Sequence, residues 1–509
     1  MRVAPRLLLR YRPLASDLTF KNNPNSTNST WCRGSVRGIA SRSAQSQIPL
    51  YATYYRGGTS RAVILQPQGL PADRKRWPAI FRQLIGSLDS YGSQLGGLGA
   101  GTSIPSKLCL VEGFHKPQDQ LLKAGKTEED DIDVDYTLVG LGIGKDEVEV
   151  ASNCGSMSSA IGPYAYNAGL LPETAYGRGD GEVTVKIRNT NTGKIVHSTF
   201  NVTGDQASVL GPYTMDGVAG TGSKIQLEFK DPYGSKTGQL LPTGKRIDHI
   251  AGYNVTCVDG PNPVIFIRAD ELKIDGTILP NELNKRAKKL VLLESIRRAA
   301  AVRMRLANPE DMVPRTIPEI GIISMSSTHT VLSGATIKSS QVDLVVRFIS
   351  ATQPHHAAPL TAAVTTAIAA RIPGTVVEQL LAPDLVDDSA ITIGHASGRL
   401  KVNVTMGRSY PVRPTSATVY STARRIFEGN MFWNDEQQPT DEQEHNVLSG
   451  TQKIPKRSLG LAFVLESRGL DPSAPILPLR HYLSRPLPRR QRFRTIRIRL
   501  GGEEDAEDE

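Results

Sequence analysis

Two stretches of small and apolar residues constrain the fold of this chain more than any other feature. Residues 154–171 (CGSMSSAIGPYAYNAGLL) and 359–372 (PLTAAVTTAIAARI) carry almost no charge on any side of a helix. A helix that is apolar all round must be buried. We therefore predict two buried helices, and we expect Pro163 to end the first one early because proline donates no helical hydrogen bond.

The sequence around these stretches is typical of β-structure, with short aliphatic runs between Gly, Pro and Asp turns. The runs are 61–66, 107–112, 134–143, 181–189, 224–229, 263–269 and 399–406. Residues 281–308 differ, since their apolar positions predict a long amphipathic helix on the outside. One buried helix in each half indicates an α+β protein of two pseudo-symmetric halves, each a barrel-like sheet around a helix. The cleft between the halves is then the expected ligand site.

The positive charge of the chain lies mainly outside this core. The formal net charge is +10, of which residues 1–46 carry +7 and residues 450–509 carry +4, which leaves −1 for residues 47–449. We therefore expect the core to bind no nucleic acid. Residues 1–46 are basic and rich in Arg, Leu and Ser, as in a mitochondrial transit peptide. They predict a mitochondrial matrix location; a disordered extension on a cytoplasmic protein is the alternative.

The C-terminal tail, residues 436–509, is expected to be disordered in large part. Within it, residues 480–500 alternate Arg with apolar residues and precede the acidic block GGEEDAEDE. Such a segment can bind RNA or a membrane surface. We favour a solvated, loosely attached tail, because no aromatic platform accompanies the basic stretch.

Several protein classes are disfavoured by the motifs that this sequence lacks. No apolar run approaches the roughly 20 residues of a membrane span, so no membrane insertion is expected. The four cysteines form no CxxC pair and the histidines no HExxH spacing, so we expect no metal site. P-loop, dinucleotide-binding and GxSxG patterns are also missing, which disfavours nucleotide binding and serine hydrolysis.

Three glycine-rich loops point to an anionic ligand. They are residues 55–61 (YRGGTSR), 90–107 (SYGSQLGGLGAGTSIPSK) and 216–225 (DGVAGTGSKI). Without a Cβ, such loops bring backbone N–H groups close to an anion. Several of them together suit a small polycarboxylate, whereas each loop alone is more often a tight hairpin turn.

Two side chains near these loops are candidates for proton transfer. Cys154 precedes the first buried helix among polar residues, where the helix dipole stabilises a thiolate; a buried structural thiol is the alternative. Lys107 ends a Gly/Ser/Thr loop as a strand begins, and a lysine with a lowered pKa can act as a base there, although most lysines are simply solvated. Arg347 is a candidate carboxylate clamp, with a structural ion pair as the commoner role.

Taken together, these motifs resemble the PrpF family, which includes methylitaconate Δ-isomerase, aconitate isomerase and oxalomesaconate tautomerase. The resemblance rests on RGGTSR, SYGSQLGGLGAGTSIPSK, SNCGSMSSAIGPYA, DGVAGTGSK, GSKTGQLLPTGK, CVDGPNPVIFI, QPHHAAPLTAAVTTAIAARIPGT and IGHASGRL, in the family order over most of 48–433. It implies the diaminopimelate epimerase-like fold, with two similar barrel-like halves around central helices. That agrees with the two buried helices predicted above.

The resemblance also implies a chemistry, a cofactor-free 1,3-proton shift next to a carboxylate through a dienolate-like anion. Lys107 and Cys154 match the family's catalytic lysine and cysteine. The implied substrate is a small unsaturated di- or tricarboxylate such as aconitate or methylitaconate. The candidate substrate-binding residues are Gly57, Gly58, Thr59, Ser60, Thr102, Ser103, Ser106, Asn153, Gly155, Ser235, Lys236, Thr237 and His355.

The sequence departs from the family pattern in three places. Arg61 stands where many members have Lys, and Ile104-Pro105 replaces Ser-Thr beside Lys107. The second half contains Cys257, but the paired cysteines of true epimerases are not clearly reproduced. An amino-acid epimerase or racemase of the same fold is therefore the weaker interpretation. It is kept as an alternative, together with a non-catalytic binding protein with basic tails.

The expected organisation has five parts. Residues 1–46 form the basic extension and 47–208 the N-terminal epimerase-like half. Residues 209–410 form the C-terminal half, 411–435 cross back to the first half, and 436–509 form the tail. A homo-oligomer is compatible with this sequence.

Overall fold

The computed structural model describes residues 47–89, 91–114, 132–144, 147–309, 312–408 and 410–435. Contacts divide the chain into residues 1–435 and 436–509, and the described residues all belong to the first of these units. The predicted transit peptide and the predicted disordered tail lie outside the described residues, so both stay predictions.

The elements follow two similar series along the chain. The strands of the first series are β1 (Ile48–Gly57), β2 (Ser60–Leu65), β3 (Lys107–Gly113), β4 (Val134–Leu141), β5 (Val148–Glu149), β6 (Gly181–Asn189), β7 (Lys194–Thr203), β8 (Gln206–Ala207) and β11 (Ile225–Lys230), with a small hairpin of β9 (Tyr213–Thr214) and β10 (Thr221–Gly222) before β11. The helices of this series are α1 (Trp77–Ile85) and α2 (Gly155–Asn167).

The second series repeats this plan. Its strands are β12 (Asp248–Ile250), β13 (Tyr253–Asp259), β14 (Pro263–Arg268), β15 (Glu319–Met325), β18 (Leu344–Ser350), β19 (Gln353–Pro354), β20 (Ala390–His395), β21 (Gly398–Met406) and β22 (Pro414–Ser421), with a small hairpin of β16 (His329–Thr330) and β17 (Thr336–Ile337). Its helices are α3 (Pro280–Asn284), α4 (Ala287–Arg303) and α5 (Leu360–Ala370). The strand β23 (Ala423–Trp433) follows β22.

The two sheets have the same strand order and the same strand directions. In the first, neighbours run β23–β1–β2–β3–β4–β6–β7–β11, and in the second β12–β13–β14–β15–β18–β20–β21–β22. The pairs β2–β3 and β4–β6 are parallel, as are their counterparts β14–β15 and β18–β20, and the other pairs in both orders are antiparallel. β11 and β22 pair with each other and join the two sheets. The halves are therefore related by a pseudo-two-fold axis.

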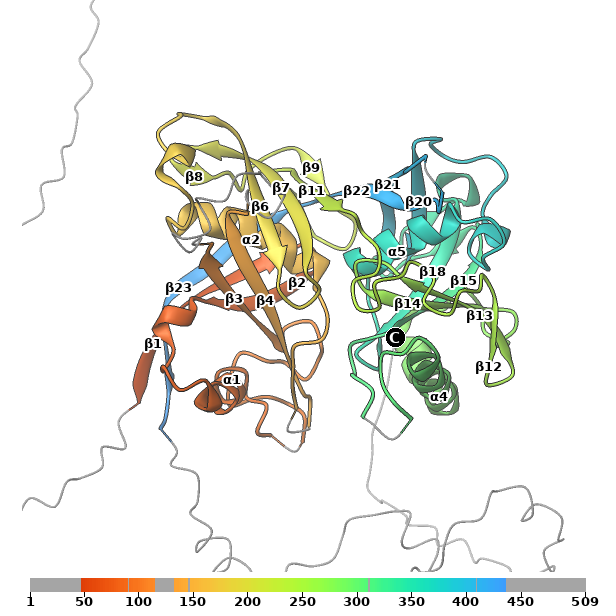
Figure 1. Ribbon diagram of the computed structural model, residues 1–509, viewed down its shortest axis with the longest axis horizontal. Helices are drawn as coiled ribbons and strands as arrows, with labels where there is room; N and C mark the ends of the chain where they lie inside the picture. The colour runs from red at the N-terminus through yellow and green to blue at the C-terminus, as the bar shows by residue number, and fades with distance from the viewer. Residues whose placement is uncertain are drawn as a thin grey trace, which may run out of the picture. The chain divides into compact units, whose positions relative to one another are not determined.

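The segment after residue 410 links the halves. β22 belongs to the second order, whereas β23 is paired with β1 over Ile48–Gly57. Figure 1 shows this, since the blue strand β23 lies beside the red strand β1. β11, which the division after residue 208 assigned to the second half, pairs with β7 and so completes the first sheet.

Each sheet wraps around one helix, and both helices are buried as predicted. Every residue of α5 is buried, and so is every residue of α2 from Gly155 to Tyr166. The prediction for Pro163 is wrong, because α2 continues through it to Asn167. An interior proline costs a helix about 3 kcal/mol. Burial of Tyr164 and Tyr166 against the surrounding strands offsets that cost, at about 1.5–3 kcal/mol for each large side chain.

The amphipathic helix expected over residues 281–308 is interrupted. α3 ends at Asn284, and α4 starts at Ala287 and ends at Arg303. Its buried positions include Leu293, Ile296 and Ala300, which recur at helical spacing and pack on the outer face of the second sheet. Within the described residues, no helix has the length and apolarity needed to cross a membrane.

Candidate active site

The N-terminal ends of the two central helices meet between the halves. A Cβ at Gly155 would lie 2.9 Å from Leu360 Cβ and 3.0 Å from the backbone nitrogen of Thr361, so glycine permits this approach. Neither helix start has a side-chain cap among the described residues. The first backbone N–H groups of both helices therefore remain available for an anion, which the positive ends of the two helix dipoles attract.

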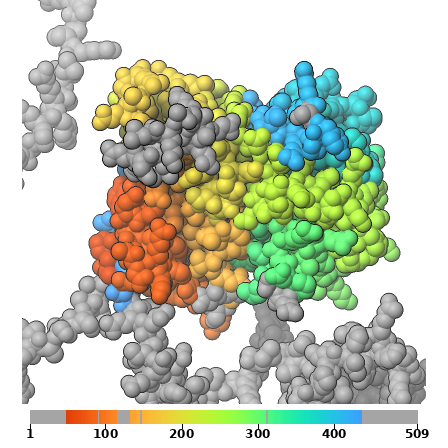
Figure 2. Space-filling view, viewed as in Figure 1, coloured from red at the N-terminus to blue at the C-terminus, as the bar shows by residue number. Residues whose placement is uncertain are grey.

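A cavity of about 60 Å³ lies at this meeting point. It accommodates several waters or part of a small ligand, since one water needs about 10–15 Å³ by this measure. The cavity is lined from both halves, and Figure 2 shows the surface of the first half in red to yellow against that of the second in green to blue. The titratable and charged residues of its lining are Lys107, Cys154, Arg315, Glu319 and His355.

Lys107, Cys154 and Ser60 form a compact triangle on the first-half side of the cavity. Lys107 and Ser60 are the first residues of β3 and β2, and because these strands are parallel both residues lie at one edge of the sheet. Cys154 is the N-cap residue of α2. Lys107 Nζ lies 3.7 Å from Cys154 Sγ and 3.5 Å from Ser60 Oγ, and the last two atoms are 3.7 Å apart. The structure thus brings the two predicted proton-transfer residues together.

Three buried polar atoms of the cavity lining have no hydrogen-bond partner within the described residues. They are Asn153 Nδ2, Arg315 Nε and Glu319 Oε2. Buried polar atoms are almost always hydrogen bonded, so each such atom calls for an explanation. Two of the three are donors, and the residues that carry them line the same cavity as the first residues of the two helices. This arrangement fits a ligand that carries carboxylate oxygens.

Asn262 connects the two halves beside these atoms. Its Oδ1 accepts from the backbone N–H of Asn153 at 2.9 Å. Its Nδ2 lies 2.8 Å from the carbonyl oxygen of Asn153, 3.1 Å from Thr361 Oγ1 and 3.2 Å from Glu319 Oε1. One amide side chain therefore fixes the residue before Cys154, the start of α5 and the buried carboxyl group relative to one another.

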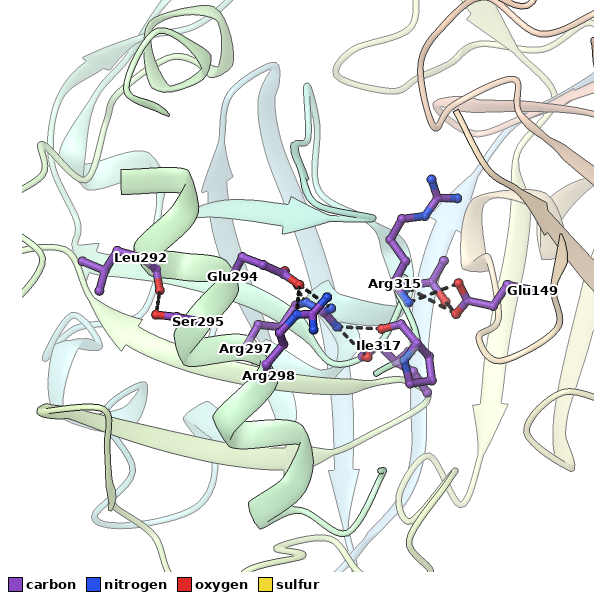
Figure 3. A network of polar contacts seen from close by, with 10 residues as sticks. Glu149, Leu292, Glu294, Ser295, Arg297, Arg298, Arg315 and Ile317 are labelled. Carbon is purple, nitrogen blue, oxygen red and sulfur yellow. Dashed lines mark hydrogen bonds and ion pairs between the residues drawn. The ribbon is translucent and has the colours of Figure 1, made fainter. Parts of the chain in front are cut away.

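The segment that carries Arg315 is held from both halves, as Figure 3 shows. Glu149, from β5 in the first half, accepts from the backbone N–H groups of Arg315 and Thr316 at 3.2 and 3.3 Å and from Thr316 Oγ1 at 2.5 Å. From α4, Arg297 donates to the carbonyl oxygens of Pro314 and Ile317 at 2.7 and 2.9 Å. The guanidinium of Arg315 donates to the Leu141 carbonyl at 2.8 Å, and its Nε lies 3.8 Å from a Glu147 carboxylate oxygen.

Desolvation shifts the pKa of two groups in the cavity lining. Burial raises the pKa of Glu319 to about 7, against the opposing effects of the Asn262 hydrogen bond, the charge of Lys107 and the Ser350 hydroxyl. Desolvation lowers the pKa of His355 to about 4, and its Nδ1 lies 2.8 Å from the Ala357 carbonyl. His355 is therefore a neutral imidazole at neutral pH.

Several predicted binding residues line the cavity and others do not. Ser60, Ser103, Ser106, Asn153, Gly155 and His355 line it together with Lys107 and Cys154. Gly57, Gly58 and Thr59 form the β1–β2 turn, outside the lining. A Cβ at Gly57 would lie 2.4 Å from the Ser156 carbonyl oxygen, so this turn packs directly on the first turn of α2. Thr102 is exposed, and its carbonyl accepts from Ser106 Oγ at 2.6 Å.

Ser235, Lys236 and Thr237 lie outside the cavity lining because they bind a different carboxylate, that of Asp259. Ser235 Oγ donates to it at 2.6 Å, and the backbone N–H groups of Lys236 and Thr237 donate at 3.0 and 2.7 Å. The Lys236 ammonium donates to the Asn191 carbonyl at 2.8 Å. This glycine-containing loop therefore closes on the chain's own aspartate.

Two other residues singled out in the sequence, Arg347 and Cys257, lie outside the cavity lining. Arg347 donates to the carbonyl oxygens of Ile278, Val346 and Thr277 at 2.7–3.1 Å, so its guanidinium is occupied by backbone. Cys257 is fully buried in the second core cluster, where desolvation raises the pKa of its thiol. Within the described residues, no group of three His, Cys, Asp or Glu side chains could hold a metal ion.

Sequence reasoning missed Arg315 and Glu319 in the cavity lining. Both lie in RTIPE (315–319), which has no glycine-rich loop and belongs to none of the recognised motifs. Asn262 was part of the motif CVDGPNPVIFI but had no assigned role. The sequence did contain a signal for Asn262. Its motif spans the β13–β14 turn of the second half, which is equivalent to the β1–β2 turn that RGGTSR forms in the first half.

Comparison with known proteins places this architecture in a family. The family described as "PrpF protein" matches residues 46–434. The chain belongs to the PrpF family. This confirms the family and fold predicted from sequence, an α+β protein of two diaminopimelate epimerase-like halves.

Named isomerases are among the relatives of this PrpF protein. The 3-methylitaconate isomerase of Eubacterium barkeri is 32% identical over 77% of this chain and 98% of its own length. The 2-methyl-aconitate isomerase of Cupriavidus necator is 32% identical over 70% of this chain and 89% of its own. A crystal structure of a methylitaconate-delta-isomerase has 29% identity and a TM-score of 0.59, and covers 81% of this chain and 100% of that protein.

Proposed function

We propose that this PrpF protein is an isomerase that moves a C=C double bond in a small unsaturated di- or tricarboxylate, by a 1,3-proton shift. The observation that carries the proposal is the Lys107–Cys154 pair, with 3.7 Å between Nζ and Sγ, in a cavity that two helix N-termini border. The named activities of the relatives support the same reaction class.

The pair can serve as the proton-transfer group of such a reaction. The Lys107 amine or the Cys154 thiolate removes a proton from an sp³ carbon next to the double bond, and the electron pair of that C–H bond becomes the new C=C bond. The electrons of the old double bond pass into the conjugated carboxylate, which gives a dienolate-like anion. A proton added at the far carbon completes the shift. Because Ser60 contacts both groups, it holds them in position.

The negative charge of the intermediate needs donors that are already in place. The free N–H groups at the starts of α2 and α5 meet this need. Asn153 Nδ2 and Arg315 Nε, which lack hydrogen-bond partners among the described residues, add two side-chain donors. These groups also suit the second or third carboxylate of the substrate.

An epimerase of the same fold would use two opposed thiols, and the cavity offers less support for it. Cys154 is the N-cap residue of α2, and the N-cap residue of α5 is Pro359. The equivalent position in the second half therefore has no thiol. Cys257 lies in the outer core and not in the cavity lining. Within the described residues, Cys154 is the one thiol that lines the cavity.

Proton NMR in D₂O tests the proposal, with cis-aconitate, trans-aconitate, methylitaconate and dimethylmaleate offered one at a time. We expect new vinyl or methylene signals and deuterium at the allylic carbon for at least one acid. Lys107→Ala and Cys154→Ala should each lower the rate by about 100-fold or more. Lys236→Ala is the matched control, since Lys236 lies outside the cavity, and should keep the wild-type rate. Full activity in both cavity variants would exclude the proposed mechanism.

A further inference from the structure

The pseudo-symmetry of the two halves assigns a counterpart to Lys107. β3 is parallel to β2 and antiparallel to β4, and β15 is parallel to β14 and antiparallel to β18. Lys107 is the first residue of β3, and Glu319 is the first residue of β15. The two side chains therefore come from equivalent strand ends, and both line the same cavity.

The neighbours of these two residues correspond as well. Ser60 opens β2 and contacts Lys107, whereas Asn262 directly precedes β14 and donates to Glu319. Cys154 precedes α2 and Pro359 precedes α5. The first half thus supplies a lysine and a thiol to the cavity, and the second half supplies a carboxyl group as its exchangeable acid.

We propose that Glu319 is a second proton-transferring residue of this site. It would add a proton to one end of the allylic anion, while the Lys107–Cys154 pair removes the proton from the other end. This role rests on the proposed isomerase function and assigns a different residue to each half of the 1,3-shift.

The geometry around Glu319 suits a carboxylic acid that acts on a ligand. The residue is 3% exposed, so its carboxyl group is shielded from bulk water. Oε1 accepts from Asn262 at 3.2 Å, which fixes one oxygen. Oε2 has no partner within hydrogen-bond distance in the described residues, and the Ser350 hydroxyl is close enough to the carboxyl group to lower its pKa. Oε2 is then the oxygen that can carry a proton to a substrate. A pKa of about 7, raised by burial, agrees with an acid that exchanges its proton near neutral pH.

The other charged and titratable groups of the cavity come from four segments. Lys107 begins β3, Cys154 precedes α2, Arg315 precedes β15 and His355 follows β19. The positive charge of Lys107 lowers the pKa of Glu319, and desolvation outweighs it. Thr361, the α5 residue to which Asn262 donates a hydrogen bond, is uncharged.

The proposed step balances in protons and electrons. The Lys107–Cys154 pair gains one proton from carbon, and Glu319 loses one proton to carbon and becomes a carboxylate. The C–H bonding pair becomes the new π bond, and the old π pair becomes the new C–H bond. Exchange with water then returns a proton to Glu319 and removes one from the pair, so no other reactant is needed.

Glu319→Gln tests this role, because the amide keeps the acceptor for Asn262 and has no acidic proton. We expect isomerisation to slow by about 100-fold or more, with KM changed by less than about threefold. In D₂O the variant should still exchange the substrate's own allylic proton, because the Lys107–Cys154 pair remains. Glu319→Asp should recover part of the rate. Glu112→Gln, on the same strand as Lys107, is the matched control and should behave as wild type.

Infrared difference spectra of wild type minus Glu319→Gln, recorded without substrate, give a second measurement. We expect a carboxylic-acid band at pH 6 that disappears as the pH rises past 7. A Glu319 ionised at pH 6, or a Glu319→Gln variant with the wild-type rate, would overturn the role of Glu319 alone. A wild type inactive on every acid offered would overturn the proposed function, and this role with it.

Discussion

At the scale of single residues, three residues of the cavity lining each have a buried polar atom without a hydrogen bond in the described part of the chain, although Arg315 Nε lies 3.8 Å from a Glu147 carboxylate oxygen. Asn153 Nδ2, Arg315 Nε and Glu319 Oε2 are buried without hydrogen bonds among the described residues. Each such atom costs about 1–3 kcal/mol in the folded protein. Three of them beside two uncapped helix N-termini indicate that this cavity is shaped for a polar ligand and not for stability.

Arg315 is expected to determine affinity for the substrate's carboxylates. A hydrogen bond to a charged group contributes about 1.5–3 kcal/mol, so Arg315→Gln should raise KM about 10- to 100-fold with a smaller effect on kcat. Steady-state kinetics on the acid identified by NMR measures both. Arg298→Gln is the control, because Arg298 lies on the exposed side of α4 and pairs with Glu294. An unchanged KM for Arg315→Gln would show that Arg315 does not bind the substrate.

Glu319 is also expected to make stability depend on pH. Its pKa is raised from 4.5 to about 7 by burial, so the folded protein binds a proton that the unfolded chain releases between these values. The stabilising contribution is therefore complete below pH 4.5 and is lost as the pH rises through 7. Relative to Glu319→Gln, the wild type should lose about 2–3 kcal/mol of unfolding free energy between pH 5 and pH 8. Urea denaturation of both proteins at each pH measures this difference, and a constant difference would contradict it.

At the scale of elements, the close approach of α2 and α5 sets the geometry of the cavity. Gly155→Ala would place a Cβ 2.9 Å from Leu360 Cβ and 3.0 Å from the Thr361 nitrogen. Overpacking of this kind costs about 1–3 kcal/mol and shifts backbone. We expect a melting temperature lower by several degrees and kcat/KM lower by at least about tenfold, since the N–H groups that face the ligand move apart.

Gly181→Ala is the matched control for this substitution, because no atom lies within 4 Å of a Cβ at Gly181. It should leave both kcat/KM and the melting temperature near the wild-type values. Equal behaviour of the two variants, measured by steady-state kinetics and thermal unfolding, would mean that the contact between the helix ends does not position the site.

Local patterns were sufficient to predict most elements of this fold. The runs at 107–112 and 181–189 became β3 and β6, and the apolar stretches became α2 and α5. Predictions failed where tertiary packing outweighs a local preference. α2 passes through Pro163 because the helix is buried on all sides, and the helix expected over 281–308 breaks between α3 and α4. Nothing in the local sequence reports how strongly a neighbouring sheet supports a helix.

The site was predictable only in part for a related reason. Lys107, Cys154 and Ser60 lie in glycine-rich motifs, so their positions at strand and helix ends could be inferred. Arg315 and Glu319 are ordinary charged residues, one just before β15 and one at its start, and only the folded chain shows that the second half brings them to the cavity. Lys236 is the converse case, a residue predicted to bind substrate that lies outside the cavity. Its loop has the composition of an anion-binding loop, but the carboxylate that it binds is that of Asp259.

At the scale of the whole molecule, the two halves repeat one architecture with different chemistry. At equivalent positions, the first half has Ser60, Lys107 and Cys154 where the second half has Asn262, Glu319 and Pro359, respectively. Identical groups on both sides would suit inversion at one carbon, where the same proton transfer runs in two directions. Unlike groups suit a shift in which one carbon loses a proton and another gains it. The divergence of the halves therefore agrees with the isomerase proposal.

The core is expected to carry the activity without the basic termini. All residues that line the cavity lie between 60 and 361, both strand orders end by residue 433, and the family match ends at 434. A fragment of residues 47–435 should keep kcat/KM within about twofold of the full chain, because no part of the site is removed. Kinetics of the two proteins at low and high salt measure this, and a salt-sensitive interaction should disappear with the tails, which hold +7 of the net charge of +10, all of it in residues 1–46. A loss of more than about tenfold from a folded fragment would show that the termini act at the site.

The transit-peptide prediction for residues 1–46 does not depend on the proposed reaction. Mitochondrial import of a fluorescent protein fused to residues 1–46 tests it.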